Sequence, residues 1–497
     1  MKKLFYFLSI AFIITSCVTG ADQYGEVIGV QGRMPYYSTD PYGMLYIPAG
    51  GFNMGQSDQD VPGSHTSKTK TVSVGAFYMD QTEITNNEYR QFVYWVRDSL
   101  ARRILGEEDN ETWLVPTYDN ELQEKDPSEW RLNWAERLTW IAHSENDRNA
   151  EQVIALKPLF LDDRQQFYNR KEIDTRKLMF KYYWIDLQEA AKKGRPQINM
   201  VSNEDFDDDA THRQKMNNTG LPYPQDGTIQ RGKDKDLGHR NKKGQHNAIR
   251  GHEDRTRFII EEIINVYPDT LCWIHDFTYS DNEHMANMYF WHPAYDDYPV
   301  VGVTWQQANA FNVWRTQLLN NFRKGRGQSF VQDFRLPSET EWEYAARGGL
   351  DLSPYPWGGP YIRNKRGCFL GNFKPIRGRY MEDGGYHTVK ANSYHPNDFG
   401  LYCMAGNVSE WCRTAYDESM YEFGHDMNTE YIYHALDHDS PSMKRKVIRG
   451  GSWKDIGYFL QTGTRSYEYQ DTAKSYIGFR SVMNHLGRGG PNKEGDF

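Results

Sequence analysis

The 497-residue chain contains 58 Lys and Arg residues against 67 Asp and Glu residues, a formal net charge of −9. Binding to a phosphate backbone needs a clustered positive surface, so this balance argues against nucleic acid as a partner. The length allows two or three ordinary domains, and aromatic residues at 14 % are enough for a large core without disulfide bonds. No apolar run reaches the roughly 18–20 residues that span a bilayer.

The first 17 residues are typical of a bacterial lipoprotein signal. Lys2 and Lys3 form a positive region, and the apolar run Leu4–Ile14 is too short for a membrane span. Small residues then precede Cys17, as in signals that are cleaved before a cysteine whose thiol receives lipid. More than one acyl chain would make such an anchor stable. The alternative is an ordinary secretory signal in which Cys17 occurs by chance.

Short strands are predicted at the start of the compact part of the chain. Residues 18–40 are predicted to be a tether. Met44–Gly55 has the pattern of a strand, a Gly turn and a second strand, and Val72–Met79 is a further strand candidate.

Three helices are predicted from capping boxes, in which a Ser or Thr is followed three residues later by Glu or Gln. They begin at Thr85, Thr304 and Ser338, and apolar residues follow each box at helical spacing. The third helix is expected to stop at Gly348, because glycine readily adopts the left-handed conformation of a C-cap. Beyond Gly349 the chain is rich in Gly, Pro, Asn and aromatic residues, which predicts turns and short strands.

A long polar segment, residues 99–291, lies between the first and second of these boxes. Its first half is predicted to be helical, for example over Trp130–His143 and Asp174–Ala191, and Arg255–Tyr267 is predicted to be one more helix. The acidic run Asn203–Asp209 is either a solvated surface or a calcium loop, although the ligand spacing of an EF-hand is absent. No internal repeat of 20–50 residues is visible.

Besides Cys17 the chain has four cysteines, namely Cys272, Cys368, Cys403 and Cys412. A lipoprotein signal implies a compartment that permits disulfide bonds. Four cysteines allow three complete pairings, and the sequence does not choose among them. Cys403 and Cys412 are the closest pair along the chain and the simplest disulfide candidate.

Four phrases resemble the formylglycine-generating enzyme family, also called the sulfatase-modifying factor family. In chain order they are Arg335–Gly349, Gly406–Trp411, Arg449–Trp453 and Ile477–Arg480. The resemblance implies an α+β fold related to the C-type lectins, with little regular secondary structure. It covers residues 41–98 and 292–484, and it makes residues 99–291 an insertion and residues 485–497 a C-terminal tail.

The family's oxidation chemistry depends on a cysteine pair that binds copper and activates oxygen. The resemblance places these cysteines two and seven residues after the aromatic residue of the Gly-Gly-Ser-aromatic phrase, where this chain has Asp455 and Leu460. A carboxylate is a poor ligand for soft Cu(I), and a leucine is no ligand. We therefore expect no copper, no formylglycine-generating activity and no other catalytic residue.

The resemblance also implies structural calcium sites, whose oxygen ligands suit a hard cation. Asn372, Phe373, Asp383 and Gly385 match the first site. The alternative is that Asn372 and Asp383 only hold turns through bonds from their side chains to the backbone.

A second calcium site maps to Cys403, Gly406, Val408 and Glu410. The family has Asn where this chain has Cys403, and a thiol is a poor calcium ligand. If this site is lost, Glu410 is expected to cap backbone amides of the Gly406–Trp411 turn.

A narrower resemblance rests on four features together. They are the lipoprotein signal, the fold without its cysteines, the tether phrase Gly25–Gly32 and the insertion. Tyr78–Thr85 and Glu88–Val93 also resemble this group, the GldK/PorK-like lipoproteins of Bacteroidetes type IX secretion and gliding motility, with the GldJ lipoproteins as a neighbouring possibility. The resemblance implies a structural subunit that self-associates into a ring at the periplasmic face of the outer membrane. The absence of an acidic cluster after Cys17 favours this face over surface export.

The implied partners are a GldN/PorN-like periplasmic protein and peptidoglycan, and residues 99–291 are expected to carry partner contacts. Two alternatives remain open from the sequence. One is an envelope lipoprotein that binds peptidoglycan or another glycan through the lectin-like fold. The other is an enzyme that has repurposed the old cleft, with Asp455 as an acid or base.

Overall fold

The computed structural model describes residues 39–56, 69–118, 130–140, 150–166, 168, 171–186, 230–231, 259–276, 284–375, 381, 385–436 and 439–486. The part from Asp40 to His485 forms one compact unit. The predicted lipidation site Cys17 and the acidic run Asn203–Asp209 lie outside the described residues. In the part that is described, no helix is both long enough and apolar enough to cross a membrane.

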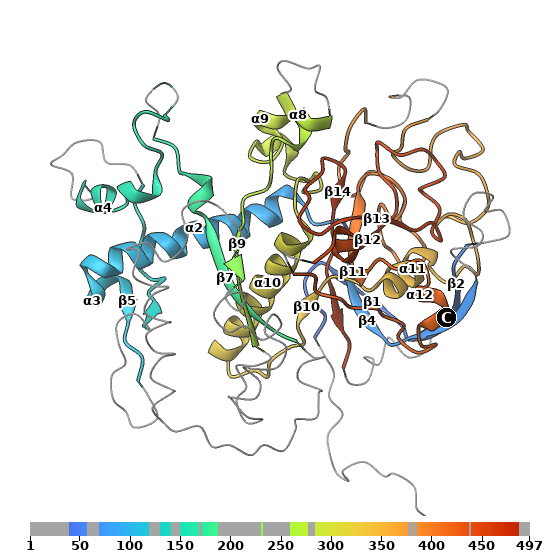
Figure 1. The fold of residues 1–497 in the computed structure, drawn as a ribbon, viewed down its shortest axis with the longest axis horizontal. Helices are drawn as coiled ribbons and strands as arrows, with labels where there is room; N and C mark the ends of the chain where they lie inside the picture. Colours follow the sequence, from blue (N-terminus) through green and yellow to red (C-terminus); the bar gives the residue numbers. More distant parts are fainter. Residues whose placement is uncertain are drawn as a thin grey trace, which may run out of the picture. The chain divides into compact units, whose positions relative to one another are not determined.

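The structure combines long helices with many short strands (Figure 1). The α-helices are α2 (Asn86–Glu108), α3 (Asn110–Trp113), α4 (Ala150–Ala155), α8 (Cys272–Asp276), α9 (His284–Met288), α10 (Trp305–Gly325), α11 (Glu339–Arg347) and α12 (Met420–Phe423). The strands are β1 (Met44–Ile47), β2 (Gly50–Met54), β3 (Lys70–Val74), β4 (Phe77–Asp80), β5 (Leu114–Val115), β6 (Arg131–Leu132), β7 (Met179–Ile185), β8 (Gln230–Arg231), β9 (Ile259–Asn265), β10 (Phe334–Arg335), β11 (Ser409–Ala415), β12 (Arg445–Arg449), β13 (Ser466–Tyr469), β14 (Ile477–Gly478) and β15 (Val482–Asn484). Short 3-10 helices cover Lys157–Leu159, Thr175–Lys177, Pro293–Tyr295 and Pro441–Lys444.

The three predicted capping boxes are confirmed. Thr85, Thr304 and Ser338 are the N-caps of α2, α10 and α11, and in each box the side chains and backbone amides bond reciprocally. Such a box satisfies amides at the helix start that have no partner within the helix. Gly348 ends α11 at a φ of 60°, in the left-handed region expected of a C-cap glycine.

Two four-stranded sheets form the centre of the described part of the chain. One has the strand order β1-β4-β15-β10 and is antiparallel, and the other has the order β13-β12-β11-β14, in which β11 and β14 are parallel. The predicted strand Val72–Met79 is in fact two strands, β3 and β4, which belong to different sheets. Beyond Gly349 turns and short strands predominate, as predicted.

The three helices predicted by range in the inserted segment are not found where the structure describes them, although the end of α2 and the short helices α3 and α4 do lie in its first half. Trp130–Leu138 holds only the short strand β6, and the other two predicted helices are replaced by strands β7 and β9. These strands pair antiparallel over seven residues, from Met179 opposite Asn265 to Ile185 opposite Ile259. Aromatic and β-branched residues fit such a half-buried, pleated surface better than a helix.

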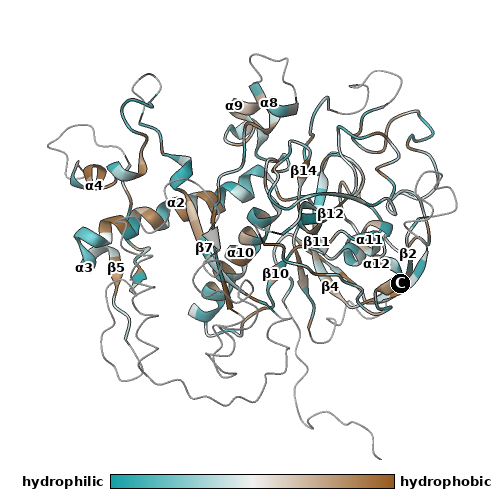
Figure 2. Ribbon diagram, in the orientation of Figure 1, coloured by the Kyte–Doolittle hydropathy of each residue, from teal (hydrophilic) through white to brown (hydrophobic). Residues whose placement is uncertain are grey.

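The inserted strands share a core with helices α2 and α10. Phe180 of β7 packs edge-on against Phe92 of α2, and Ile264 of β9 is fully buried in the same cluster as Phe311 and Trp314 of α10. Figure 1 shows β7 and β9 beside α10, with the sheet of β11 and β12 on the other side of that helix. Figure 2 shows hydrophobic residues within α2, β7 and α10. Part of the inserted segment is therefore part of the core.

Candidate functional site

The Gly-Gly-Ser-Trp turn positions Asp455 and Leu460, the two residues that the resemblance places where a cysteine pair is expected. Gly450 and Gly451 have φ values of 91° and 68°, and a Cβ on Gly451 would lie 2.7 Å from the carbonyl oxygen of Phe459. Only glycine fits this backbone without strain. The turn directs Trp453 into a buried aromatic cluster and leaves Asp455 partly exposed.

Asp455 is held by its own turn. Its Oδ2 accepts a hydrogen bond from the Ser452 hydroxyl at 2.6 Å, and its backbone carbonyl accepts from the amide of Lys374 at 2.8 Å. Burial raises the pKa of the Asp455 carboxyl above its ordinary value, and the Ser452 hydrogen bonds oppose that shift. Among the described residues no group of three or more His, Cys, Asp or Glu side chains could hold a metal ion.

Leu460 is sealed inside an apolar cluster. Its side chain has no exposed surface and packs with Tyr355, Phe373 and Ala405. Its methyl groups also lie beside Gly371 and Gly451. This position is thus a packing site, and a polar or metal-binding group there would have to be buried at a cost of free energy.

An inserted helix covers the other side of the turn. Trp273 of α8 stacks on Trp453 with 5.9 Å between ring centroids, and His387 meets both rings edge-on. Trp273 is 1 % exposed and Trp453 is 7 % exposed. This contact could not be predicted from the sequence, because Trp273 lies in a segment that the resemblance treats as an insertion.

The predicted first calcium site is described only in part. The Asn372 amide group donates to the carbonyl of His387 at 2.7 Å, and the Asn372 carbonyl accepts from the amide of Asn407 at 2.9 Å. Asn372 therefore links two loops. Phe373 lies in the Leu460 cluster and Gly385 packs against Val389, while Asp383 lies outside the described residues. Calcium at this site remains a prediction.

The residues of the predicted second calcium site do not fit a cation. Both Glu410 oxygens accept from Arg480, with Nη2–Oε1 at 2.6 Å and Nε–Oε2 at 2.7 Å, and Trp342 donates to Oε2 at 2.7 Å. A cation here would have to approach a fully buried guanidinium. Burial, followed by the charge of Glu83, raises the pKa of the Cys403 thiol well above its ordinary value, so the thiol stays neutral.

Two expectations for this region need correction. Cys403 and Cys412 are buried free thiols and do not form a disulfide. The carboxylate that binds the Gly406–Trp411 turn is Glu83, which accepts from the Asn407 side chain at 2.6 Å and from the Val408 amide at 3.3 Å. Burial, with the charge of Glu410 second, raises the pKa of Glu83 well above its ordinary value.

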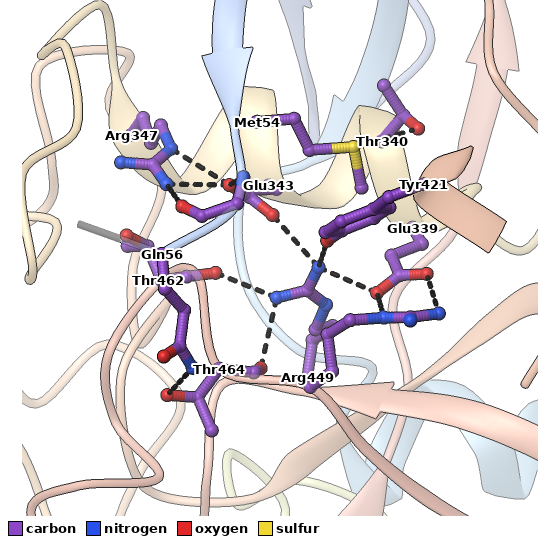
Figure 3. A network of polar contacts seen from close by, with 12 residues as sticks. Met54, Gln56, Glu339, Thr340, Glu343, Arg347, Tyr421, Arg449, Thr462 and Thr464 are labelled. Atoms are coloured by element: carbon purple, nitrogen blue, oxygen red, sulfur yellow. Dashed lines mark hydrogen bonds and ion pairs between the residues drawn. The ribbon is translucent and has the colours of Figure 1, made fainter. Parts of the chain in front are cut away.

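A second buried polar network joins residues of the phrases Arg335–Gly349 and Arg449–Trp453 (Figure 3). Arg449 donates to Glu343 at 2.9 Å and pairs with Glu339 at 2.7 Å, and all three side chains are fully buried. Arg465 also binds Glu339, and Arg347 binds Glu343. The sequence offered a signal for this network, because Glu339, Glu343 and Arg347 are four residues apart along α11 and so share one face.

Comparisons with known proteins agree with this architecture. The family model described as "Sulfatase-modifying factor enzyme 1-like domain" matches residues 33–156 and 199–485. An inactive C-alpha-formylglycine-generating enzyme 2 from Bos taurus is 33% identical over 190 residues, which cover 37% of this chain and 50% of that protein. A formylglycine-generating enzyme from Thermomonospora curvata is 32% identical over 197 residues, which cover 38% of this chain and 57% of that protein.

The chain thus spans about half the length of these curated relatives, which include inactive and active proteins. Among solved structures, PvdO from Pseudomonas aeruginosa is 14% identical and matches with a TM-score of 0.40, covering 91% of this chain and 100% of that one. Because the family model matches well over half of the chain, this protein belongs to the family with a sulfatase-modifying factor enzyme 1-like domain.

Proposed function

We propose that this protein is a structural lipoprotein subunit of the type IX secretion and gliding machinery, at the periplasmic face of the outer membrane. In this proposal it self-associates into a ring, a GldN/PorN-like periplasmic protein binds it, and peptidoglycan lies against the ring. The lipoprotein signal before Cys17 and the tether phrase Gly25–Gly32 support this assignment over other members of the family.

One observation supports the proposal: packed side chains occupy the region in which the resemblance expects the family's chemistry. Leu460 is fully buried where a cysteine would be needed, and Trp273 covers the adjacent Trp453. Buried carboxylates also pair with the guanidinium groups of Arg449 and Arg480.

Replacement of Asp455 by Asn in the source cells separates the structural role from a catalytic one. Asn retains an oxygen that accepts from Ser452 and loses the ability to exchange a proton, so Asp455→Asn should leave secretion through the machinery unchanged. Protein amount is compared by immunoblot. Loss of secretion at a normal protein amount would contradict the structural role and support an enzyme that uses Asp455 as acid or base.

A further inference from the structure

One stretch of the chain is strongly basic although the chain as a whole is acidic. Residues 361–380 contain six Lys or Arg residues and no Asp or Glu, whereas the formal net charge of the chain is −9. Five exposed side chains from the described part of this stretch form what we call the basic rim, namely Tyr361, Arg363, Lys365, Arg366 and Lys374. Both cations and an aromatic ring are therefore presented to solvent here.

A tight turn fixes the backbone that carries Lys365 and Arg366. The Asn364 side chain accepts hydrogen bonds from the amides of Arg366 at 2.9 Å and Cys368 at 3.0 Å, and the Asn364 amide donates to the Cys368 carbonyl at 2.9 Å. Gly367, at a φ of 88°, closes the turn in a conformation that suits glycine. Cations on such a fixed backbone lose less conformational entropy when they bind a partner.

The two parts of the basic rim meet at the turn that holds Asp455. The Lys374 amide donates to the Asp455 carbonyl at 2.8 Å. Ile362, which follows Tyr361, lies against Gly457, because a Cβ on that glycine would be 3.6 Å from the Ile362 Cδ1. The carboxyl of Asp455 itself is bonded within the turn. The cations of the rim and its exposed ring thus lie around one turn.

The basic rim can attract an anion although the whole protein is acidic. At physiological ionic strength, exposed charges are largely screened beyond a Debye length of about 8 Å. A partner that touches only the rim therefore meets its cations, while the acidic residues elsewhere act on it weakly. A wide anionic surface, such as a bilayer or a second copy of this acidic chain, would approach those acidic residues as well. The charge distribution thus favours a narrow anionic partner, such as a polymer strand.

We propose that the basic rim binds an anionic glycan strand, in the form of peptidoglycan whose peptide stems carry free carboxylates. Lys and Arg side chains donate charge-assisted hydrogen bonds to carboxylates. The ring of Tyr361 is 76% exposed and offers a flat, electron-rich face on which the C–H groups of a sugar can pack. An acidic peptide would use the cations but not this ring. The inference rests on the proposed function, in which peptidoglycan lies against the protein, and it names the surface that makes the contact.

Sedimentation with purified peptidoglycan sacculi measures this binding. Lys365→Glu with Arg366→Glu should weaken the binding of the detergent-extracted, full-length protein about tenfold, because two attractive charges become repulsive. Lys324→Glu with Arg326→Glu makes the same charge change at two other exposed residues and should bind like the unsubstituted protein. Equal thermal unfolding midpoints show that both variants fold. Equal losses for both variants would reflect net charge alone and overturn the proposal.

Two further measurements identify the chemistry of the partner. Sacculi whose free carboxylates have been amidated should no longer bind, because the cations of the rim would have no anionic partner. Tyr361→Ala should weaken binding to sacculi about threefold and leave binding to poly-glutamate unchanged, because the latter has no sugar ring. Unchanged binding of amidated sacculi would overturn the proposal. So would an equal effect of Tyr361→Ala on both polymers, or tighter binding to anionic lipid vesicles than to sacculi.

The outcomes separate this contact from the ring. If the unsubstituted protein forms a large particle of many copies but does not sediment with sacculi, the rim proposal is wrong and the ring proposal stands. If the protein is a monomer whose binding to sacculi still depends on the rim, the ring function fails and the rim remains a glycan-binding surface.

Discussion

At the scale of single residues, a prominent feature of the described part of this molecule is its buried pairs of charged side chains. Arg449 and Arg480 have no exposed surface, and each is paired with buried carboxylates from a different part of the chain. Burial alone would raise the pKa of Glu339, but Arg465 and Arg449 outweigh it and hold that pKa below its ordinary value. Removing one member of such a pair leaves an uncompensated buried charge, which costs far more free energy than an exposed pair contributes.

Arg449→Met should therefore lower the free energy of unfolding by about 3–5 kcal/mol. Arg465 and Arg347 still neutralise part of the charge on Glu339 and Glu343, so the protein should fold at low temperature. Urea unfolding measures the loss. Arg366→Met removes the same charge from an exposed position and should change stability by less than about 0.5 kcal/mol. Equal effects of the two substitutions would contradict the role assigned to the network.

The capping-box residue Glu341 gives a prediction about pH. Burial would raise its pKa, but Arg335 dominates and lowers it from 4.5 to about 2. A depressed pKa stabilises the fold above pH 4.5, and this contribution is lost as the pH falls toward 2. Glu341→Gln should therefore cost about 3 kcal/mol at pH 7 and progressively less between pH 4.5 and 2.

Urea unfolding of both proteins at several pH values measures this difference. The matched control is the exposed residue Glu418, for which Glu418→Gln should have little effect at any pH. A deficit for Glu341→Gln that does not change with pH would show that the Arg335 pair is not its cause.

At the scale of elements, local signals predicted those parts of the fold whose structure is set locally. Each of the three helices with a capping box begins where the box places it, because the box satisfies the same helix's own amides. The β7–β9 pair was missed because its partners lie some 80 residues apart along the chain. Trp273 and Glu83 were missed for the same reason, since each acts on a residue more than 150 positions away.

The inserted strand β7 should therefore behave as part of the core. Phe180→Ala removes a buried ring that packs on Phe92 and Trp95, and it should lower the free energy of unfolding by about 3–5 kcal/mol. Tyr183→Ala, at an exposed position of the same strand, should cost less than about 1 kcal/mol. Unfolding is followed by circular dichroism and by Trp fluorescence. Separate transitions by the two probes would show that the inserted strands unfold independently of the rest.

At the scale of the whole molecule, the described part of the inserted segment is packed into the core of the family fold. The family could be predicted from the sequence because the prediction depends on short phrases, such as Arg449–Trp453. The substituted cysteine positions stay a prediction from the same phrases. Sequence reasoning could not find that Leu460 is sealed or that α8 covers Trp453, since both depend on packing between distant segments.

The native mass of the detergent-extracted protein, with its co-purifying proteins identified, tests the central claim most directly. A structural ring subunit predicts a very large particle that contains many copies of this chain and one periplasmic partner. A monomer near the full-chain mass of 58.2 kDa, with no partner, would contradict that account. That result would favour one of the alternative functions, either a glycan-binding lipoprotein or an enzyme that uses Asp455.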